Sequence, residues 1–192
     1  DLVRARGNFR TDYADLIQRA ITHSDNTAND RILRRVGGAE AVEDFLAAKK
    51  ITGVRFGADE RTKQSAIAGL RWDQAFSQGN AFFDARDLVP DAARRAAFEG
   101  YLADPLDGAT PLGITKALAR LARGELLSPA STALILATLQ QTRSGPQRLK
   151  GGVPPGWSIG HKTGTGQVLD IVPPGAPADQ AGYNDVGILT AP

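Results

Sequence analysis

The order of the secondary-structure patterns along this chain is the feature that most constrains its fold. Apolar residues recur at helical spacing from Tyr13 to Ile21, and the pattern resumes until Gly37-Gly38, a natural helix end. Beyond Pro155 the pattern changes to short apolar runs between glycine and proline turns, which is typical of strands. Helices followed by an antiparallel-looking sheet indicate an α/β (α+β) architecture.

The remaining elements are predicted by capping residues and turns. Further helices are expected around Val42 to Leu46, from Pro90-Asp91 to Leu102, after Thr110-Pro111 and after Ser128-Pro129. Short strands are expected at 157–159, 168–172 and 185–189. We therefore divide the chain into a mostly helical lobe, residues 1–150, which includes an extended active-site loop at about 51–109, and a sheet segment, residues 151–192.

Composition excludes several kinds of protein. The chain of 192 residues has no cysteine, which excludes disulfides and thiolate chemistry, and its two histidines are too few for a histidine-built metal site. The net charge of +2 is spread along the chain, so a nucleic-acid partner is not expected. No apolar run is long enough for a membrane span.

Two polar motifs lie at opposite ends of the chain. Ser24-Asp25-Asn26 follows the first expected helix, and His161 to Gly166 spells His-Lys-Thr-Gly-Thr-Gly. Taken alone, the first motif is also explained by helix capping and the second by a strand that ends in a glycine-rich turn. No serine in the sequence is followed by a lysine three residues later.

Together with their surroundings, these motifs resemble the class A β-lactamases and related penicillin-recognising serine hydrolases, whose motif set is S-x-x-K, S-D-N and K-T-G. The blocks Gly152 to Trp157, Gly124 to Ser128, and Ser24 through Gly37-Gly38 to Leu46 occur in the family's order. The resemblance implies a helical lobe packed beside an antiparallel sheet, with the site between them. Because the S-x-x-K segment is missing, we expect the chain to be a fragment, incomplete at both ends, whose attacking serine lies upstream.

The resemblance also assigns roles to the two motifs. Ser24 would pass a proton to the leaving nitrogen, Asn26 would hold the substrate's side-chain amide, and Asp25 would brace the turn. Lys162 would supply a positive field beside the nucleophile. Thr163 would bind the substrate carboxylate, and Thr165 would contribute a backbone N–H to the oxyanion hole. Gly164 and Gly166 would allow the strand to approach the substrate closely.

For hydrolysis of the acyl-enzyme, the resemblance places Glu60 where the family has a general base. Gln64 stands where an Asn helps to hold the water, and Asp30 stands where an Asn contacts the catalytic Glu, so two close carboxylates would favour a shared proton. Ala58 replaces an Arg that normally pairs with an Asp. The alternative is that Glu60 is a solvated charge.

The segment from Ser65 to about Asp107 is longer than in the family, so the loop must be rebuilt, with the 91–104 helix as a flap over the site. Arg148 is the expected carboxylate-binding arginine, the alternative being a surface arginine.

The resemblance implies a β-lactam hydrolase that acts through a serine acyl-enzyme, confers antibiotic resistance, uses no cofactor and no metal, and works as a periplasmic or secreted monomer. Two alternatives remain open. One is a D-alanyl-D-alanine peptidase or transpeptidase of cell-wall synthesis, and the other is a penicillin-binding sensor or scaffold that does not hydrolyse.

Overall fold

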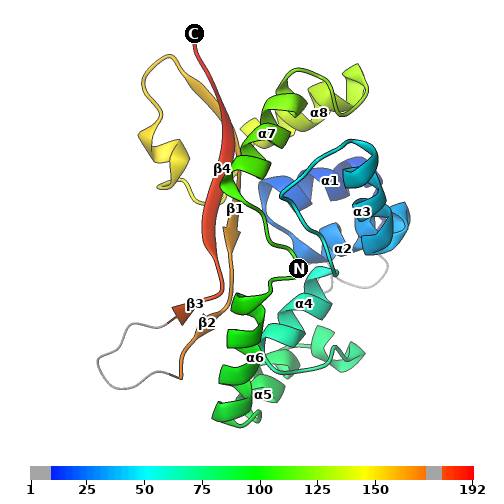
Figure 1. Cartoon of the computed structure of the whole chain (residues 1–192), viewed down its shortest axis with the longest axis vertical. Coiled ribbons are helices and arrows are strands. Elements are labelled where there is room, and N and C mark those ends of the chain that lie inside the picture. Colours follow the sequence, from blue (N-terminus) through cyan, green and yellow to red (C-terminus); the bar gives the residue numbers. More distant parts are fainter. Residues whose placement is uncertain (1–9, 172–178) are drawn as a thin grey trace.

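The computed structural model of the chain describes residues 10–171 and 179–192 (Figure 1). The helices are α1 Tyr13–Thr22, α2 Asn26–Val36, α3 Gly38–Ala48, α4 Glu60–Ile67, η1 Gln74–Ser77, α5 Ala81–Asp87, α6 Asp91–Ala103, α7 Pro111–Ala122, α8 Pro129–Gln140 and η2 Leu149–Gly152. The strands are β1 Ser158–Thr165, β2 Val168–Leu169, β3 Asp179–Gln180 and β4 Tyr183–Thr190. The expected α+β architecture is confirmed.

Local capping explains where the helices begin and end. The Asp25 carboxylate accepts the N–H of Ala28 at the start of α2, and Gly37 closes that helix in the left-handed conformation. Thr110 and Ser128 cap α7 and α8 ahead of a first-turn proline, as predicted.

The segment from residue 51 to residue 109 is mainly helical rather than an extended loop. It contains α4, η1, α5 and α6, whose short lengths and polar faces weaken the sequence periodicity. The predicted flap over the site is wrong for α6. This helix packs on α4, and its Phe98 is buried in a core cluster with Ile67 and Leu169.

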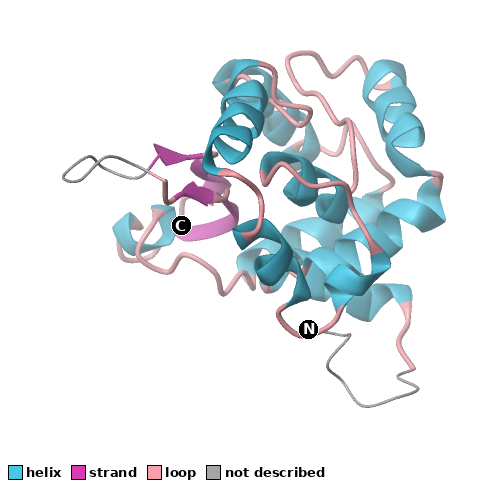
Figure 2. Cartoon of the chain, turned by 90° about the horizontal axis from the view of Figure 1, so that it is seen from below, coloured by secondary structure: helices cyan, strands magenta, loops and turns pink. Residues whose placement is uncertain are grey.

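The sheet carries β1 and β4 side by side along one flank of the helices (Figures 1 and 2). These strands pair antiparallel from Ser158 with Thr190 to Thr165 with Tyr183. Helix α8 packs on β1 and α7 on β4, which positions the sheet against the helical lobe.

Both long strands extend further than their predicted cores at 157–159 and 185–189, because the pairing continues through the glycine-containing motif. The strand expected at 168–172 is limited to 168–169 among the described residues, and Val172 lies outside them.

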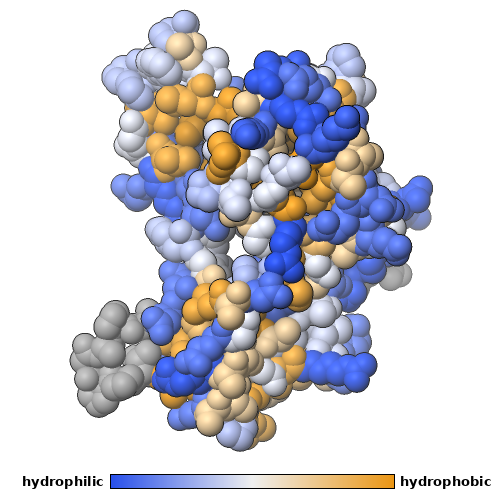
Figure 3. All heavy atoms as spheres, viewed as in Figure 1, coloured by the Kyte–Doolittle hydropathy of each residue, from blue (hydrophilic) through white to orange (hydrophobic). Residues whose placement is uncertain are grey.

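Apolar side chains reach the surface near the paired strands. Leu112, Leu149 and Leu189 are exposed there, and Figure 3 shows apolar residues gathered on this face of the molecule beside η2 and β4.

Candidate active site

Ser24 and Lys162, which are 138 residues apart in the sequence, meet in the structure. The Lys162 Nζ donates to Ser24 Oγ at 2.7 Å and to the carbonyl oxygen of Thr163 at 2.6 Å. Ser24 adopts φ +57°, an uncommon conformation for a residue other than glycine. The tight turn between α1 and α2 therefore aims the serine hydroxyl at the lysine. The expectation that the two motifs share a site agrees with this contact.

Burial changes the acid–base behaviour of Lys162. Removal from water lowers its pKa below the usual lysine value, although the charges of Glu60 and Asp185 oppose this effect and that of Arg148 adds to it. A lysine of this kind releases a proton more readily than an exposed one. Its positive charge is also influenced by the carboxylates of Glu60 and Asp185 and by the guanidinium of Arg148.

Thr163 is buried rather than open to solvent. Its hydroxyl shares a hydrogen bond of 2.7 Å with Ser144 Oγ, which comes from the turn after α8. Sequence reasoning missed Ser144, because a lone serine in a turn carries no signal of a partner 19 residues away.

The residue before Lys162 forms a buried pair with the neighbouring strand. His161 is fully buried, and its Nδ1 lies 2.9 Å from Asp185 Oδ1. Thr142 donates to the His161 carbonyl oxygen at 2.5 Å. These contacts fix the strand that carries Lys162, and sequence analysis did not assign them.

Arg148 lies against the same strand. Its guanidinium donates to the carbonyl oxygens of Gly164 and Asn184 and, at 2.7 Å, to Thr165 Oγ1. The group also stacks 3.8 Å above the ring of Tyr183. The arginine therefore holds the end of the motif strand and is not merely a surface residue. Its role in carboxylate binding stays a prediction.

The two motif glycines are needed for strand packing. A Cβ on Gly164 would lie 2.5 Å from the Asn184 side chain, and one on Gly166 would lie 2.7 Å from the Gly182 nitrogen. Their close approach in this structure is thus to the neighbouring strand segment.

Asp30 and Glu60 lie close together, and the proton that they are expected to share stays a prediction. The Asp30 carboxylate accepts the backbone N–H groups of Glu60 at 2.8 Å and of Arg61 at 3.2 Å. Burial raises the pKa of Asp30, against the effect of these two N–H groups, and the charges of Asp59 and Glu60 raise it further. Asp30 therefore positions the first turn of α4, which carries Glu60.

The Glu60 carboxylate is paired with a lysine that sequence analysis missed. Lys63 Nζ donates to Glu60 Oε1 at 2.6 Å and to Asp107 Oδ2 at 2.5 Å, and Tyr101 donates to the other oxygen of Asp107 at 2.7 Å. Lys63 thus links Glu60 to Asp107, which comes from the segment after α6. Glu60 is not a freely solvated charge, because three charged side chains form one connected group.

Gln64 links Glu60 to the turn after β1. Its Nε2 donates to Glu60 Oε2 at 3.3 Å, while its side-chain and backbone oxygens accept from Gln167 Nε2 at 2.9 and 2.6 Å. The amide of Gln64 therefore contacts both the predicted base and the residue that directly follows the Lys-Thr-Gly motif segment.

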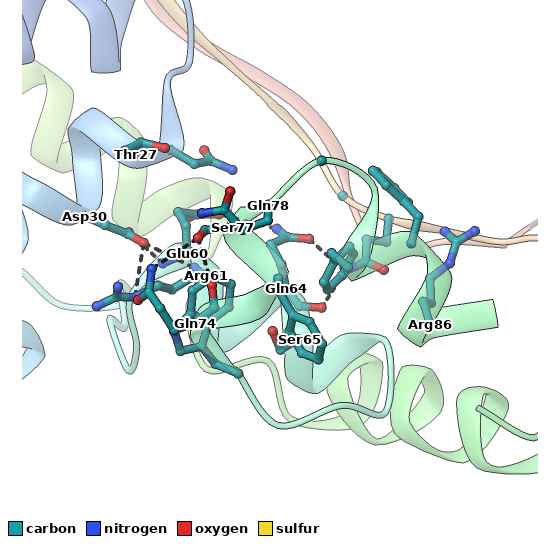
Figure 4. Close-up of a pocket in the computed structure, with 18 of the residues that line it drawn as sticks. Thr27, Asp30, Glu60, Arg61, Gln64, Ser65, Gln74, Ser77, Gln78 and Arg86 are labelled. Carbon is teal, nitrogen blue, oxygen red and sulfur yellow. Dashed lines mark hydrogen bonds and ion pairs between the residues drawn. The ribbon is translucent and has the colours of Figure 1, made fainter. Parts of the chain in front are cut away.

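A cavity of about 820 Å³ opens beside these residues. Its lining brings together predicted site residues from three elements: Asn26, Asp30, Glu60, Gln64, Thr165 and Gly166. Figure 4 shows Asp30, Glu60 and Gln64 along the cavity, with Arg86 at its far end in this view. Ser24 lines a separate hollow next to α1 and also contacts Lys162.

No group of three or more histidine, aspartate or glutamate side chains within residues 10–171 and 179–192 could hold a metal ion. Within the same ranges, no helix has the length and apolar character required to cross a bilayer.

Comparison with known proteins agrees with this geometry. Residues 4–192 match the model of the beta-lactamase enzyme family. Beta-lactamase CTX-M-4 of Salmonella typhimurium is 26% identical over 153 residues, or 80% of this chain and 41% of the relative. Extended-spectrum beta-lactamase PER-1 of Pseudomonas aeruginosa is 25% identical over 184 residues, or 96% of this chain and 46% of the relative.

Solved structures give the same result for the fold. The extended-spectrum beta-lactamase TLA-3 superposes with a TM-score of 0.67 at 24% identity, over 98% of this chain and 54% of that one. A variant of the last common ancestor of Gram-negative class A beta-lactamases gives a TM-score of 0.64 at 25% identity, over 95% of this chain and 51% of that one. The chain spans about half the length of the proteins that it resembles. Since the family model matches almost the whole sequence, the chain belongs to the beta-lactamase enzyme family.

Proposed function

We propose that the full-length protein is a serine β-lactam hydrolase. The observation that carries this proposal is the 2.7 Å contact between Lys162 Nζ and Ser24 Oγ, which joins the two motifs into one proton-transfer site. A lactam ring opened by a serine of the full-length protein releases an amine nitrogen that needs a proton. Ser24 delivers that proton, and Lys162, whose pKa is lowered by burial, replenishes it.

Substrate positioning in this proposal uses the cavity beside the two motifs. Asn26 binds the amide of the substrate's acyl side chain, and Thr165 contributes its N–H to the oxyanion hole. Thr163 and Arg148 bind the ring carboxylate, which requires Arg148 to exchange one of its bonds to the strand. The proposed reaction uses no metal or organic cofactor, and the protein acts as a periplasmic or secreted monomer. Because it breaks down β-lactams, its activity confers antibiotic resistance.

Deacylation is assigned to Glu60 as the base that activates water, with Gln64 as a further polar contact. The bond from Lys63 occupies one oxygen of the Glu60 carboxylate. That contact favours one second candidate, a D-alanyl-D-alanine peptidase or transpeptidase whose acyl-enzyme with penicillin persists.

The experiment follows colour and protein mass after the full-length protein is mixed with a chromogenic cephalosporin. Sustained turnover with little adduct is expected. In Glu60→Gln, turnover should fall by about a hundredfold or more and the adduct should accumulate.

Glu40→Gln, on the exposed face of α3, is the matched control and should turn over like the wild type. A single stoichiometric burst in the wild type, with a stable adduct, would instead identify the peptidase or a covalent penicillin-binding sensor. Absence of both colour and adduct would indicate a scaffold and refute the proposal.

A further inference from the structure

The segment from Trp72 to Arg86 forms a wall of aromatic rings on the active-site cavity. Four rings follow one another in edge-to-face contact. The ring centroids are 6.0 Å apart for Trp72 and Phe76, 6.0 Å for Phe76 and Phe82, and 5.5 Å for Phe82 and Phe83. All four line the cavity that also contains Asn26 and Glu60. This segment lies within the part of the chain that is longer than in the family.

These rings are only partly covered by protein. Trp72, Phe76 and Phe82 are half-buried, and Phe83 is 54% exposed. Aromatic surface left open in a concave site is typical of a binding pocket for a flat apolar group.

Polar groups on the same cavity suit an amide-linked ligand. The Ser65 hydroxyl is buried in the cavity lining and has no hydrogen-bond partner among the described residues. Gln74, Ser77 and Gln78 line the same cavity, and Figure 4 shows Ser77 and Gln78 near Glu60, with Gln64 between them and Ser65 in this view. These side chains supply donors and acceptors next to the rings.

The cations on the cavity differ in how they are paired. Arg61 bonds to Asp59 at 2.8 Å, and Arg86 is within 3.5 Å of Asp170. Arg34, by contrast, is exposed and has no ion-pair partner among the described residues.

The position of Arg34 relates it to the substrate amide. Asn26, Asp30 and Arg34 follow one another at four-residue spacing on the cavity face of α2. The helical rise separates the first and last of them by about 12 Å, and helical side chains lean toward the N-terminus. An anionic group a few bonds beyond the amide held by Asn26 is therefore within reach of the Arg34 guanidinium.

We propose that the wall of residues 72–86, together with Arg34, binds the acyl side chain of the substrate and selects one that is aromatic and carries an anionic group. The inference rests on the proposed function, since it places the lactam ring at Ser24 and Lys162 and the side-chain amide at Asn26. The aromatic group lies against Trp72 and its neighbours.

The test compares three penicillins in their second-order rates of acylation of the full-length protein, a step that precedes any role of Glu60. The three are 6-aminopenicillanic acid, which has no acyl side chain, benzylpenicillin, and α-carboxybenzylpenicillin, which adds one carboxylate. We expect benzylpenicillin to react about tenfold faster than the first, and the carboxylated compound to gain a further factor of about three.

Substitutions show which residues cause the gain from the aromatic group and the gain from the extra carboxylate. Trp72→Ala should slow both aromatic substrates by about five- to tenfold and leave 6-aminopenicillanic acid within about twofold, and Trp72→Phe should restore most of the loss. Arg34→Gln should remove only the gain from the extra carboxylate.

Leu88→Ala and Arg31→Gln are the matched controls, because both residues are exposed and neither lines the cavity. Equal rates for the three penicillins, or equal slowing of all three by Trp72→Ala, would overturn this inference while leaving the proposed function intact. Failure of all three to acylate the protein would overturn both.

Discussion

Replacement of Lys63 by methionine removes the charge at the centre of the Glu60 group while keeping an unbranched side chain. The Lys63 side chain is 11% exposed and lies 2.6 Å from Glu60 and 2.5 Å from Asp107. Without the ammonium, the two carboxylates would face an apolar side chain between them. We expect the folded state to lose free energy of unfolding at neutral pH.

The magnitude follows from the distances and the exposure. At an effective dielectric constant of about 20, each pair has a Coulomb attraction of about 6 kcal/mol. The cost of taking the charges out of water cancels most of it, and removal of one partner from a buried pair typically costs about 3–5 kcal/mol. Because Glu60 and Asp107 keep 22% and 26% of their side chains exposed, we expect a loss of about 2–3 kcal/mol, or about 4–12 °C in Tm.

The loss should depend on pH in a defined direction. Burial raises the pKa of Asp107, but its hydrogen bonds from Lys63 and Tyr101 outweigh burial and hold the pKa below the usual value of 3.8. A lowered carboxyl pKa contributes stability that is present above the unfolded-state pKa and disappears as the pH falls through the folded-state one.

Burial lowers the pKa of Lys63, but its bonds to Asp107 and Glu60 outweigh burial and hold it above the usual 10.5. That contribution is complete below the unfolded-state pKa and is lost as the pH rises through the folded-state one. The difference in free energy of unfolding between wild type and variant should therefore be largest at pH values between the pKa of Asp107 and that of Lys63. It should shrink below about pH 4.

Urea unfolding of the full-length proteins at several pH values measures this difference. Lys116→Met is the control, because Lys116 lies exposed on α7 and makes no ion pair among the described residues. A loss below about 0.5 kcal/mol at pH 7, or a loss that does not shrink at pH 3, would refute the reasoning.

Two further substitutions separate chemistry from packing. Ser24→Ala should slow acylation by a chromogenic cephalosporin by about a hundredfold, because it removes the hydroxyl bonded to Lys162, and stopped-flow measurement of an unchanged rate would contradict this role. Phe98→Ala should lower the free energy of unfolding by about 3–4 kcal/mol in urea titrations, because the ring is 2% exposed within the core between α4 and α6. Leu88→Ala, 85% exposed, should by comparison leave that free energy almost unchanged, and an equal loss in both variants would contradict the assigned core.

The sequence predicts the helices with clear caps because these caps are encoded in short segments. The caps at Thr110 and Ser128 are local hydrogen bonds that a few residues specify. The contact between Ser24 and Lys162 was predicted through the family's motif order rather than through any local pattern.

The surroundings of Glu60 could not be predicted in the same way. Lys63 stands three residues after Glu60, a spacing typical of an exposed helix pair, and nothing local indicates its bond to Asp107, 44 residues away. Similarly, Phe76 and Phe82 gave no helical period, since η1 and α5 are each shorter than two full turns of an α-helix.

The two attachments of α4 have a mechanical consequence. Asp30 fastens the first turn of this helix to α2, and Gln64 fastens the next turn to Gln167 beside the motif strand. Glu60 is thus located relative to both walls of the cavity at once. A shift of the segment that follows the motif strand would therefore act on Glu60 through the Gln64 amide, while the two backbone N–H groups bonded to Asp30 hold the start of α4 against α2.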